Sequence, residues 1–474
     1  MTPRFCSICI SGDIAGRPGP VRDVADSVLA SATVSRPVSV LKRPRTLLAA
    51  TVIVGLALSG TATATEAQVR QALAAWTAKN PNTTAAIWRL DASGHDEIAS
   101  YKAQVPRRPA STMKVVTAAA ALQAFGPEYT FETHLYMGQT ATYSGPVLRT
   151  PLYLKGYGDP TLSTALYSRR YLGRTGRQVT PLVTALKRNG ITAIKGPVVV
   201  DETYFDTKRK VSSWPARYYG ECQPLSALTV NQSYLTNARS GYAKRPALVA
   251  GAQLKSAMKS MKVTHTGTVR TGRTPQKARL VGVVKSPPLK TVTRLMLPPS
   301  DNFIAEMLTK NIGAATVNSG TTAAGTRATM NLLGRYLSPS DRIVDGSGLD
   351  RGNRLSAESL VTLLASANAD PTWGKALVTS LPRGNEGTLR GRFSPLGGRL
   401  RAKTGYINGT SGLTGIVVST NGQRYAFALL MNDSSIGGAR ETQNRLVRML
   451  ASGTADVPGN VPPPVTPDPP SATK

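Results

Sequence analysis

The hydrophobic and polar positions follow helical and strand-like periods in the two outer parts of the chain. Apolar residues that recur every three to four positions predict helices, and strict alternation predicts strands. Gly126-Pro127 ends one of the helical patterns. The expected helices cover residues 66–80, 111–125 and 439–450, and the expected strands cover 84–90, 97–101, 414–419 and 425–431. Both outer parts therefore have a mixed α/β character.

The stretch from about 137 to 288 has a different pattern. It consists of short alternating segments that are separated by Gly and Pro turns and by basic runs. Its expected strands lie at 153–155, 198–201 and 281–285. Helical patterns dominate again from about 289. We therefore expect one α/β domain, formed by residues 65–136 and 289–454, which the middle stretch interrupts as an insertion.

The two ends of the chain have patterns of their own. Three basic residues between 42 and 45 precede an apolar run over 47–58, and Ala62-Thr63-Ala64 offers a cleavage site, as in a secretory signal peptide. A buried helix is the alternative. We expect residues 1–64 to be removed and the mature chain to be secreted. No apolar run reaches the ~18 residues of a membrane-spanning helix, so no transmembrane anchor is expected. Residues 455–474 contain seven prolines, which is typical of a disordered tail.

The balance of charge is strongly basic. Lys and Arg number 58 against 26 Asp and Glu, which gives a formal net charge of +32. The leader holds seven of the basic and three of the acidic residues, so the mature chain would carry about +28. A basic chain often binds nucleic acid, but here the basic residues are dispersed and few aromatic residues lie among them. For an exported protein we expect anionic wall polymers, and no nucleic acid, as the partners of this charge.

Histidine and cysteine are too sparse for several common catalytic and metal sites. His95, His134 and His265 are the only histidines, and no G-x-S-x-G or H-E-x-x-H motif occurs. A Ser-His-Asp hydrolase is therefore disfavoured, and we expect neither a metal nor a cofactor. Removal of the leader would leave Cys222 as the only cysteine, which we expect to be a buried thiol.

One short motif can activate a serine without histidine. Ser111-Thr112-Met113-Lys114 opens one of the expected helices, and residues three apart share a helix face, so Lys114 can reach the Ser111 hydroxyl. The helix N-terminus adds a positive partial charge and free N–H groups beside the serine. The same S-x-x-K spacing recurs at Ser39–Lys42 in the leader and at Ser256–Lys259, which we expect on the surface of a basic helix.

Two further motifs follow in order along the chain. Ser300-Asp301-Asn302 comes after a Pro-Pro turn and opens an apolar helical pattern, where an N-cap is the alternative interpretation. Lys403-Thr404-Gly405 lies on a strand-like stretch, where the alternative is an edge strand with an exposed lysine. Ser366-Ala367-Asn368 also fits S-x-N, but it lies inside a helical pattern. The ordered set S-x-x-K, S-D-N and K-T-G is much rarer by chance than any one of its motifs.

With these motifs the chain resembles the class C low-molecular-mass penicillin-binding proteins, the serine D-alanyl-D-alanine carboxypeptidases and endopeptidases. The resemblance covers about 66–452 and includes further family-like segments. These are Tyr153–Ser163, Gly196–Asp201, Ser226-Ala227-Leu228 with Asn231, Asp345–Leu349, and Gly387–Leu389 before Arg392-Phe393. The resemblance implies an α/β (α+β) fold with a transpeptidase/β-lactamase-like domain, in which an antiparallel sheet has helices on both faces. It also implies two smaller β-rich domains within the insertion.

The resemblance further implies an acyl-enzyme mechanism on the stem peptides of peptidoglycan. Ser111 would attack the carbonyl between two D-amino acids while Lys114 takes its proton, and the nearby ammonium of Lys403 would lower the pKa of Lys114. The N–H groups of Ser111 and Tyr406 would bind the oxyanion. Water would then hydrolyse the acyl-enzyme. β-Lactam antibiotics, which resemble the dipeptide, would acylate Ser111 and leave slowly.

The other motif residues are expected to bind the substrate or relay protons. Ser300 would relay a proton to the leaving amine, and Asn302 would bind the substrate amide. Thr404 would contact the terminal carboxylate, next to Gly405 on the substrate-binding strand. Family members commonly have Thr or Ser where this chain has Tyr406, so its side chain is expected to reshape the recognition of that carboxylate.

Three alternatives share parts of this pattern. A class A β-lactamase would need an E-x-x-L-N segment between S-D-N and K-T-G, and none is present. A strict endopeptidase would cut the cross-links between stem peptides, and the sequence does not separate it from a carboxypeptidase. A non-catalytic wall-binding protein would not need an intact Ser111, Lys114, Ser300 and Lys403.

Overall fold

The computed structural model describes residues 64–92 and 94–455 of the chain. Apart from residues 64 and 455, the predicted leader over 1–64, with its S-x-x-K match at Ser39–Lys42, and the predicted tail over 455–474 lie outside the described residues. None of the described helices combines the length and the apolar character that crossing a lipid bilayer requires.

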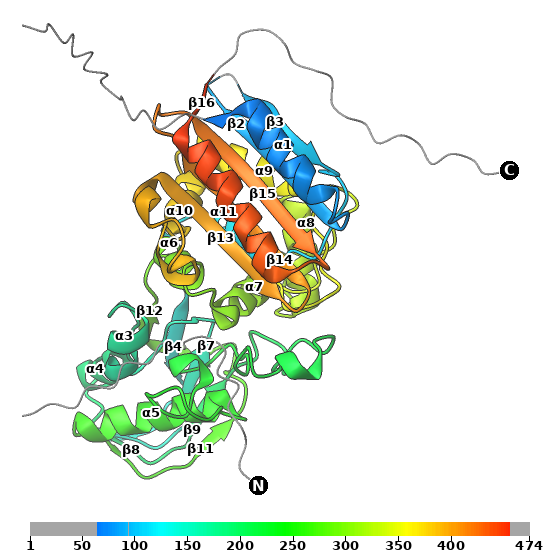
Figure 1. The fold of residues 1–474 in the computed structure, drawn as a ribbon. Helices are drawn as coiled ribbons and strands as arrows, with labels where there is room; N and C mark the ends of the chain where they lie inside the picture. Colours follow the sequence, from blue (N-terminus) through cyan, green and yellow to red (C-terminus); the bar gives the residue numbers. More distant parts are fainter. Residues whose placement is uncertain (1–63, 93, 456–474) are drawn as a thin grey trace, which may run out of the picture. The chain divides into compact units, whose positions relative to one another are not determined.

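A five-stranded antiparallel sheet joins the two outer parts of the chain (Figure 1). Its strands are β2 (Thr83–Leu90), β3 (His95–Tyr101), β13 (Leu400–Ile407), β14 (Thr410–Val418) and β15 (Arg424–Asn432). The strand order is β13-β14-β15-β2-β3, so β2 from the N-terminal part pairs with β15 from the C-terminal part. Ile87 and Phe427 are register partners in this pair, and both lie in the core on one face of the sheet.

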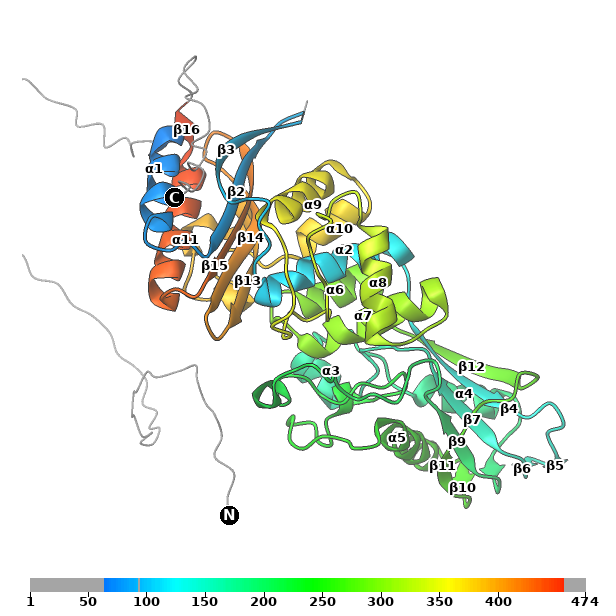
Figure 2. The same cartoon turned by 90° about the vertical axis from the view of Figure 1, so that its right-hand side faces the viewer.

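Helices cover both faces of the sheet (Figure 2). α1 (Glu66–Thr77) and α11 (Ile436–Ser452) lie against one face, where their buried apolar residues share a core with Ile87 and Phe427. The layer on the other face includes α2 (Met113–Phe125), α9 (Ala357–Ala369) and α10 (Trp373–Ser380). An antiparallel sheet with helices on both faces confirms the fold class inferred from the sequence.

α2 lies in the interior of the second layer. Its first ten residues, Met113–Leu122, are all buried, as expected for a helix that is apolar on almost every side. It packs against α7 (Asn302–Val317), and α6 (Leu289–Met296) and α8 (Thr322–Leu332) complete the layer. A 3₁₀ turn, η1 (Ala110–Thr112), replaces the first turn of the helix expected from residue 111.

The stretch between α2 and α6 forms two further sheets. Its elements are β4 (Glu132–Met137), β5 (Tyr143–Ser144), β6 (Val147–Leu148), β7 (Leu152–Gly156), α3 (Ala165–Tyr171), α4 (Thr180–Arg188), β8 (Ala193–Ile194), β9 (Val198–Asp201), α5 (Pro246–Ser260), β10 (Thr264–His265), β11 (Val269–Thr271) and β12 (Arg279–Lys285). The strand orders are β11-β9-β7-β4-β12 and β10-β8-β6-β5. Leu182 and Leu254, from the helices α4 and α5, share one core with residues of both sheets. The boundaries at 137 and 288 and the division into two domains stay predictions.

Candidate active site

Ser111 lies in the η1 turn, immediately before α2. The turn is held by Thr112, whose Oγ1 donates to the Pro109 carbonyl over 2.7 Å and whose backbone N–H donates to the same oxygen over 3.3 Å. The N-terminus of α2 therefore places its positive partial charge next to the serine hydroxyl.

Lys114 reaches Ser111 from inside the protein. Its Nζ lies 3.0 Å from Ser111 Oγ, 2.7 Å from Asn302 Oδ1 and 2.6 Å from the Ser347 carbonyl oxygen. These three oxygens match the three protons of an ammonium group. The side chain is fully buried, and this burial lowers the pKa of Lys114 from 10.5 to about 8. Loss of one proton would leave an amine that still faces the serine.

The pKa of Lys114 reflects burial opposed by nearby carboxyl groups. Burial is the largest cause and lowers the pKa, while the charges of Asp345, Glu306 and Asp301 raise it. The sequence suggested that the ammonium of Lys403 would lower this pKa, but burial is the main reason. The pKa of Lys403 is itself held well below its usual value, first by burial and then by the charge of Lys114.

The S-D-N segment forms the start of α7. Asp301 is the N-cap, and its Oδ1 accepts from a backbone N–H of the first turn at 2.8 Å. Asn302 Oδ1 accepts from Lys114, and Asn302 Nδ2 donates to the Glu221 carbonyl over 2.8 Å. The N-cap interpretation thus holds for the aspartate and leaves the asparagine in the site. Ser300 has a left-handed backbone with φ of 62°, and within the described residues its hydroxyl bonds to neither lysine of the site.

β13 carries the K-T-G segment along an edge of the central sheet. Lys403 is fully buried and its Nζ donates to the Thr404 carbonyl over 2.8 Å, so the alternative of an exposed lysine is wrong. The Thr404 hydroxyl donates to Thr388 Oγ1 over 2.6 Å. Thr388 lies in the short turn η4 (Gly387–Leu389) and is not among the candidate residues predicted from the sequence.

Tyr406 lies on the solvent side of β13. Its side chain is 53% exposed, and the Arg440 guanidinium of α11 lies 5.5 Å from the centre of its ring. Such a cation–π contact is worth about 0.5–1 kcal/mol at an exposed position. At this position the chain therefore presents an aromatic ring next to a positive charge.

Gly405 allows β13 to approach the serine turn. A Cβ at this position would lie 2.5 Å from the Pro109 carbonyl oxygen, a backbone atom that no rotamer change can move. Gly412 on β14 is the register partner of Gly405, but its Cβ would lie 3.0 Å from the Thr112 methyl group and 3.2 Å from the same Pro109 oxygen, so its overlap with backbone is much smaller. The contact between the sheet and η1 therefore depends most strongly on Gly405.

We predict that Gly405→Ala displaces β13 from the Ser111 turn. The overlap with backbone should lower the free energy of unfolding by roughly 1–3 kcal/mol. Displacement of the Tyr406 N–H should slow the acylation of Ser111 by a β-lactam about 100-fold. Gly412→Ala is the matched control, and it should lower both the free energy of unfolding and the acylation rate by less than Gly405→Ala does. Thermal melting and acylation rates measure the effects, and a Gly405→Ala protein that behaves like wild type would contradict the contact.

Two buried carboxyl groups beside Lys114 were not among the sequence candidates. Glu306 of α7 accepts through Oε1 from the N–H groups of Gly346 and Ser347, at 3.0 and 2.8 Å. Asp345 accepts from Trp214 Nε1 and from the Gly348 N–H, each at 2.7 Å. The family-like segment Asp345–Leu349 was one available signal. The other was the four-residue spacing of Glu306 from the asparagine of S-D-N, which places both on one helix face.

Several other sequence features lie away from this site. His95, His134 and His265 contact Trp88, Glu132 and the Gly196 carbonyl, respectively. Ser256 and Lys259 are both exposed on α5, as expected. In the part of the chain that the structure describes, no three His, Cys, Asp or Glu side chains gather into a group that could hold a metal ion.

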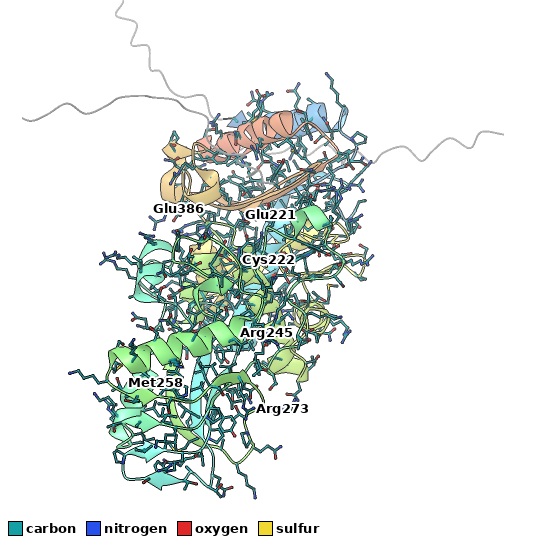
Figure 3. The ribbon with its side chains drawn as sticks, turned by 90° about the horizontal axis from the view of Figure 1, so that it is seen from below. Glu221, Cys222, Arg245, Met258, Arg273 and Glu386 are labelled. Atoms are coloured by element: carbon teal, nitrogen blue, oxygen red, sulfur yellow. The ribbon has the colours of Figure 1, made fainter. Side chains whose placement is uncertain are left out.

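Cys222 is fully buried, as expected. Burial raises the pKa of its thiol well above the usual value. It follows Glu221, whose carbonyl holds the Asn302 amide, and both residues are labelled in Figure 3. The segment around Cys222 therefore covers one side of the candidate site.

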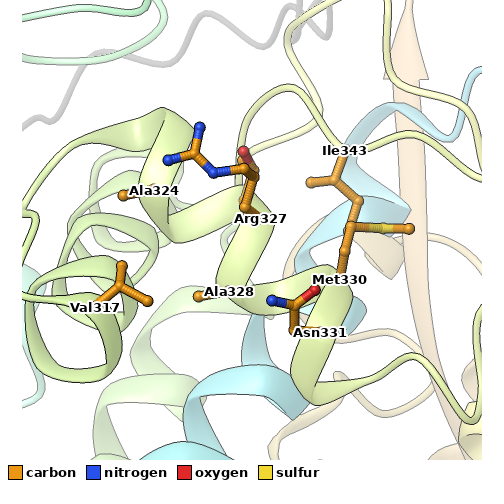
Figure 4. Close-up of a pocket in the computed structure, with 8 residues that line it drawn as sticks. Val317, Ala324, Arg327, Ala328, Met330, Asn331 and Ile343 are labelled. Carbon is orange, nitrogen blue, oxygen red and sulfur yellow. The ribbon is translucent and has the colours of Figure 1, made fainter.

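A pocket of about 280 Å³ lies between the end of α7 and α8 (Figure 4). Its wall contains the apolar side chains of Val317, Met330 and Ile343 together with Arg327. None of its lining residues is a candidate site residue. This pocket is therefore separate from the candidate site at the serine turn.

Comparison with known proteins identifies a family and several relatives of this chain. The family model described as the D-Ala-D-Ala carboxypeptidase 3 (S13) family matches residues 69–243 and 230–452. A carboxypeptidase of Mycobacterium tuberculosis is 31% identical over 349 residues, which cover 70% of this chain and 73% of the relative. A D-alanyl-D-alanine carboxypeptidase of Actinomadura sp. is 27% identical over 446 residues, which cover 76% of this chain and 80% of the relative.

The fold also has a counterpart among solved structures. Penicillin binding protein 4 from Haemophilus influenzae superposes with a TM-score of 0.66 at 22% identity. The match covers 80% of this chain and 98% of the solved one. The likeness therefore includes the inserted sheets as well as the central one.

Proposed function

The chain belongs to the D-Ala-D-Ala carboxypeptidase 3 (S13) family, and on this premise we propose that it hydrolyses peptidoglycan stem peptides through an acyl-enzyme on Ser111. The bond that breaks is the one between two D-alanine residues. The observation that carries the proposal is the 3.0 Å contact between Lys114 Nζ and Ser111 Oγ, because a serine needs an adjacent base to become a nucleophile.

Acylation starts from neutral Lys114. The amine takes the proton of the Ser111 hydroxyl, and Oγ attacks the carbonyl carbon of the penultimate D-alanine. The N–H groups of Ser111 and Tyr406 bind the oxygen on which negative charge develops. The close contact of β13 with η1 at Gly405 supports this pairing of two N–H groups from different elements.

The leaving D-alanine needs a proton on its nitrogen. Ser300 relays to this nitrogen the proton that Lys114 took from Ser111, so Lys114 becomes neutral again, and Lys403 tunes this relay. Asn302 binds the substrate amide and holds Lys114. Thr404 contacts the terminal carboxylate. Water then attacks the acyl-enzyme with Lys114 again as the base, which releases the shortened stem peptide and restores Ser111.

β-Lactam antibiotics are proposed as inhibitors of the same site. Their strained amide resembles the D-alanyl-D-alanine dipeptide, so Ser111 opens the ring and forms the same kind of ester. The ring-opened product stays tethered to the part that would otherwise depart, which slows the attack of water.

We predict that acylation accelerates with pH through the titration of Lys114. The pKa of about 8 leaves about one-tenth of the amine neutral at pH 7 and about nine-tenths neutral at pH 9. The acylation rate should therefore rise about tenfold over this interval and then level off. Stopped-flow measurements with a fluorescent penicillin test this, and a rate that is flat or falls between pH 7 and 9 would contradict a lysine base.

The basic charge of the chain is proposed to act in the cell wall. The predicted export signal and a net charge of about +28 on the mature chain support a protein that works outside the membrane among anionic wall polymers. Retention of the mature protein on isolated cell walls should then weaken as salt is raised. Retention that does not depend on salt would contradict the proposal that the basic charge holds the protein on the cell wall.

One experiment tests the reaction itself. The mature protein is incubated with a stem pentapeptide and, separately, with a cross-linked stem-peptide dimer, and released D-alanine and cleaved dimer are measured. Release of D-alanine is the expected result. A protein that leaves the pentapeptide intact but cuts the dimer is a strict endopeptidase, and one that cuts neither is not a peptidase of this kind.

A further inference from the structure

We infer that Glu306 is a positioning residue for Lys114, because it fixes the backbone carbonyl against which the lysine amine lies and so sets the distance from that amine to Ser111. The inference rests on the proposed role of Lys114 as the base. It concerns a side chain that lies behind the lysine and does not touch the substrate.

The geometry forms a chain of three contacts. Glu306 Oε1 accepts from the N–H groups of Gly346 and Ser347 at 3.0 and 2.8 Å. The Ser347 carbonyl in turn accepts from Lys114 Nζ at 2.6 Å. The other face of this short segment is held from α2, where Thr117 Oγ1 donates to the Gly346 carbonyl over 2.7 Å. The segment can therefore present its carbonyl to the lysine in only one place.

Besides Ser111, Lys114 donates to Asn302 Oδ1 and to the Ser347 carbonyl oxygen, and helix α7 positions both of these acceptors. Asn302 and Glu306 are four residues apart on α7 and share one face. Asn302 contacts Lys114 directly at 2.7 Å, and Glu306 acts through Ser347. A shift of this part of α7 would therefore move both acceptors together.

The second oxygen of Glu306 distinguishes its two charge states. Oε2 is buried and has no hydrogen-bond partner within the described residues, so a negative charge there is costly. A proton on Oε2 removes this cost and leaves both bonds to Oε1 intact. Burial and the charge of Asp345 raise the pKa of Glu306 to about 8, in line with a protonated group near neutral pH.

Glu306 also interacts electrostatically with the charged groups around it. Asp345 and Lys114 act on it most strongly, and its own charge is felt at Cys222 and Lys310. An ionised Glu306 raises the pKa of Lys114 and so favours the ammonium form, which is not a base. The protonated form holds the carbonyl in place without this penalty.

Two substitutions separate these effects. Glu306→Gln keeps an acceptor oxygen at the Oε1 position and resembles the protonated acid, whereas Glu306→Ala removes the contact with the segment. Asp341→Asn is a matched control. Asp341 is also buried and also accepts from two backbone N–H groups, those of Ser338 and Ser356. Within the described residues it makes no hydrogen bond to a partner of Lys114.

The measurement is the rate of Ser111 acylation by a fluorescent penicillin between pH 6 and 10, together with the melting temperature. Glu306→Gln should stay within about threefold of wild type at pH 7, and the midpoint of its rising limb should fall by roughly half a pH unit, because an anion that raises the pKa of Lys114 is gone. Glu306→Ala should be folded yet about 30-fold slower or more. Asp341→Asn should change the melting temperature but not the midpoint.

Specific outcomes overturn the inference. It is wrong if Glu306→Ala acylates as fast as Asp341→Asn, or if the midpoint for Glu306→Gln equals that of wild type. If Glu306→Ala does not fold, the midpoint for Glu306→Gln still decides. Failure of the wild-type protein to acylate at Ser111 would instead refute the proposed function.

Discussion

Replacement of Ser111 by alanine is expected to abolish both the acylation by β-lactams and the hydrolysis of D-Ala-D-Ala peptides. Alanine removes the hydroxyl oxygen that lies 3.0 Å from Lys114 Nζ, so no ester can form there. Loss of a nucleophile of this kind lowers turnover by at least about 10⁴-fold. Peptide mass mapping after incubation with a labelled penicillin should find the adduct on Ser111 in wild type and no adduct in the variant.

A matched control for this experiment is Ser256→Ala. Ser256 is the first residue of the other S-x-x-K match within the described residues, and it lies exposed on α5 with Lys259. The control should keep the wild-type adduct and the wild-type rate. An adduct on Ser256, or hydrolysis by Ser111→Ala at the wild-type rate, would show that the nucleophile has been assigned to the wrong serine.

The second large effect that we expect is a slower acylation of Ser111 in the variant Lys114→Met. Methionine fills nearly the same buried volume but has no proton acceptor, so Ser111 loses its base while the helix keeps its packing. General base catalysis contributes about 10²–10⁴-fold, and acylation should slow by that amount. Burst measurements of penicillin acylation, which report the chemical step alone, are the suitable readout.

Lys310→Met provides the comparison for this variant. Lys310 is another almost fully buried lysine, on α7, but it pairs with Asp206 and has no contact with the serine turn. Its replacement leaves a partly buried carboxylate unpaired, so stability should fall while the acylation rate of the folded protein stays near wild type. Equal acylation by Lys114→Met and Lys310→Met would exclude Lys114 as the base.

Much of the central fold could be predicted from hydrophobic periods. The strands at 84–90, 97–101 and 425–431 and the terminal helix all occur within a few residues of their expected bounds, because one face of each element is buried in a single core. β9 occupies the predicted residues 198–201. The 3₁₀ turn before α2 and the two-residue strands of the insertion were missed, since such short elements leave no period to detect.

The motif residues of the candidate site could also be predicted from the sequence, but the residues that surround them in the fold could not. Spacing along a helix places Ser111 against Lys114 without knowledge of the fold. Glu306, Asp345 and Thr388 acquire their positions only when segments far apart in the chain meet. Burial of Lys403 was not predictable either, because its place on an edge strand suggested exposure, whereas in the fold the η1 turn packs against β13.

The pairing of β2 with β15 has a consequence for how the enzyme comes into being. Register partners such as Ile87 and Phe427 are about 340 positions apart, so the central sheet closes late and at a high cost in loop entropy. The serine turn is translated early, but Lys403 and Tyr406, the second proposed oxyanion donor, arrive near the end of synthesis. Chains that stop before β13 therefore contain the proposed nucleophile without Lys403 and Tyr406, and we expect catalytic competence only once β13 has been added.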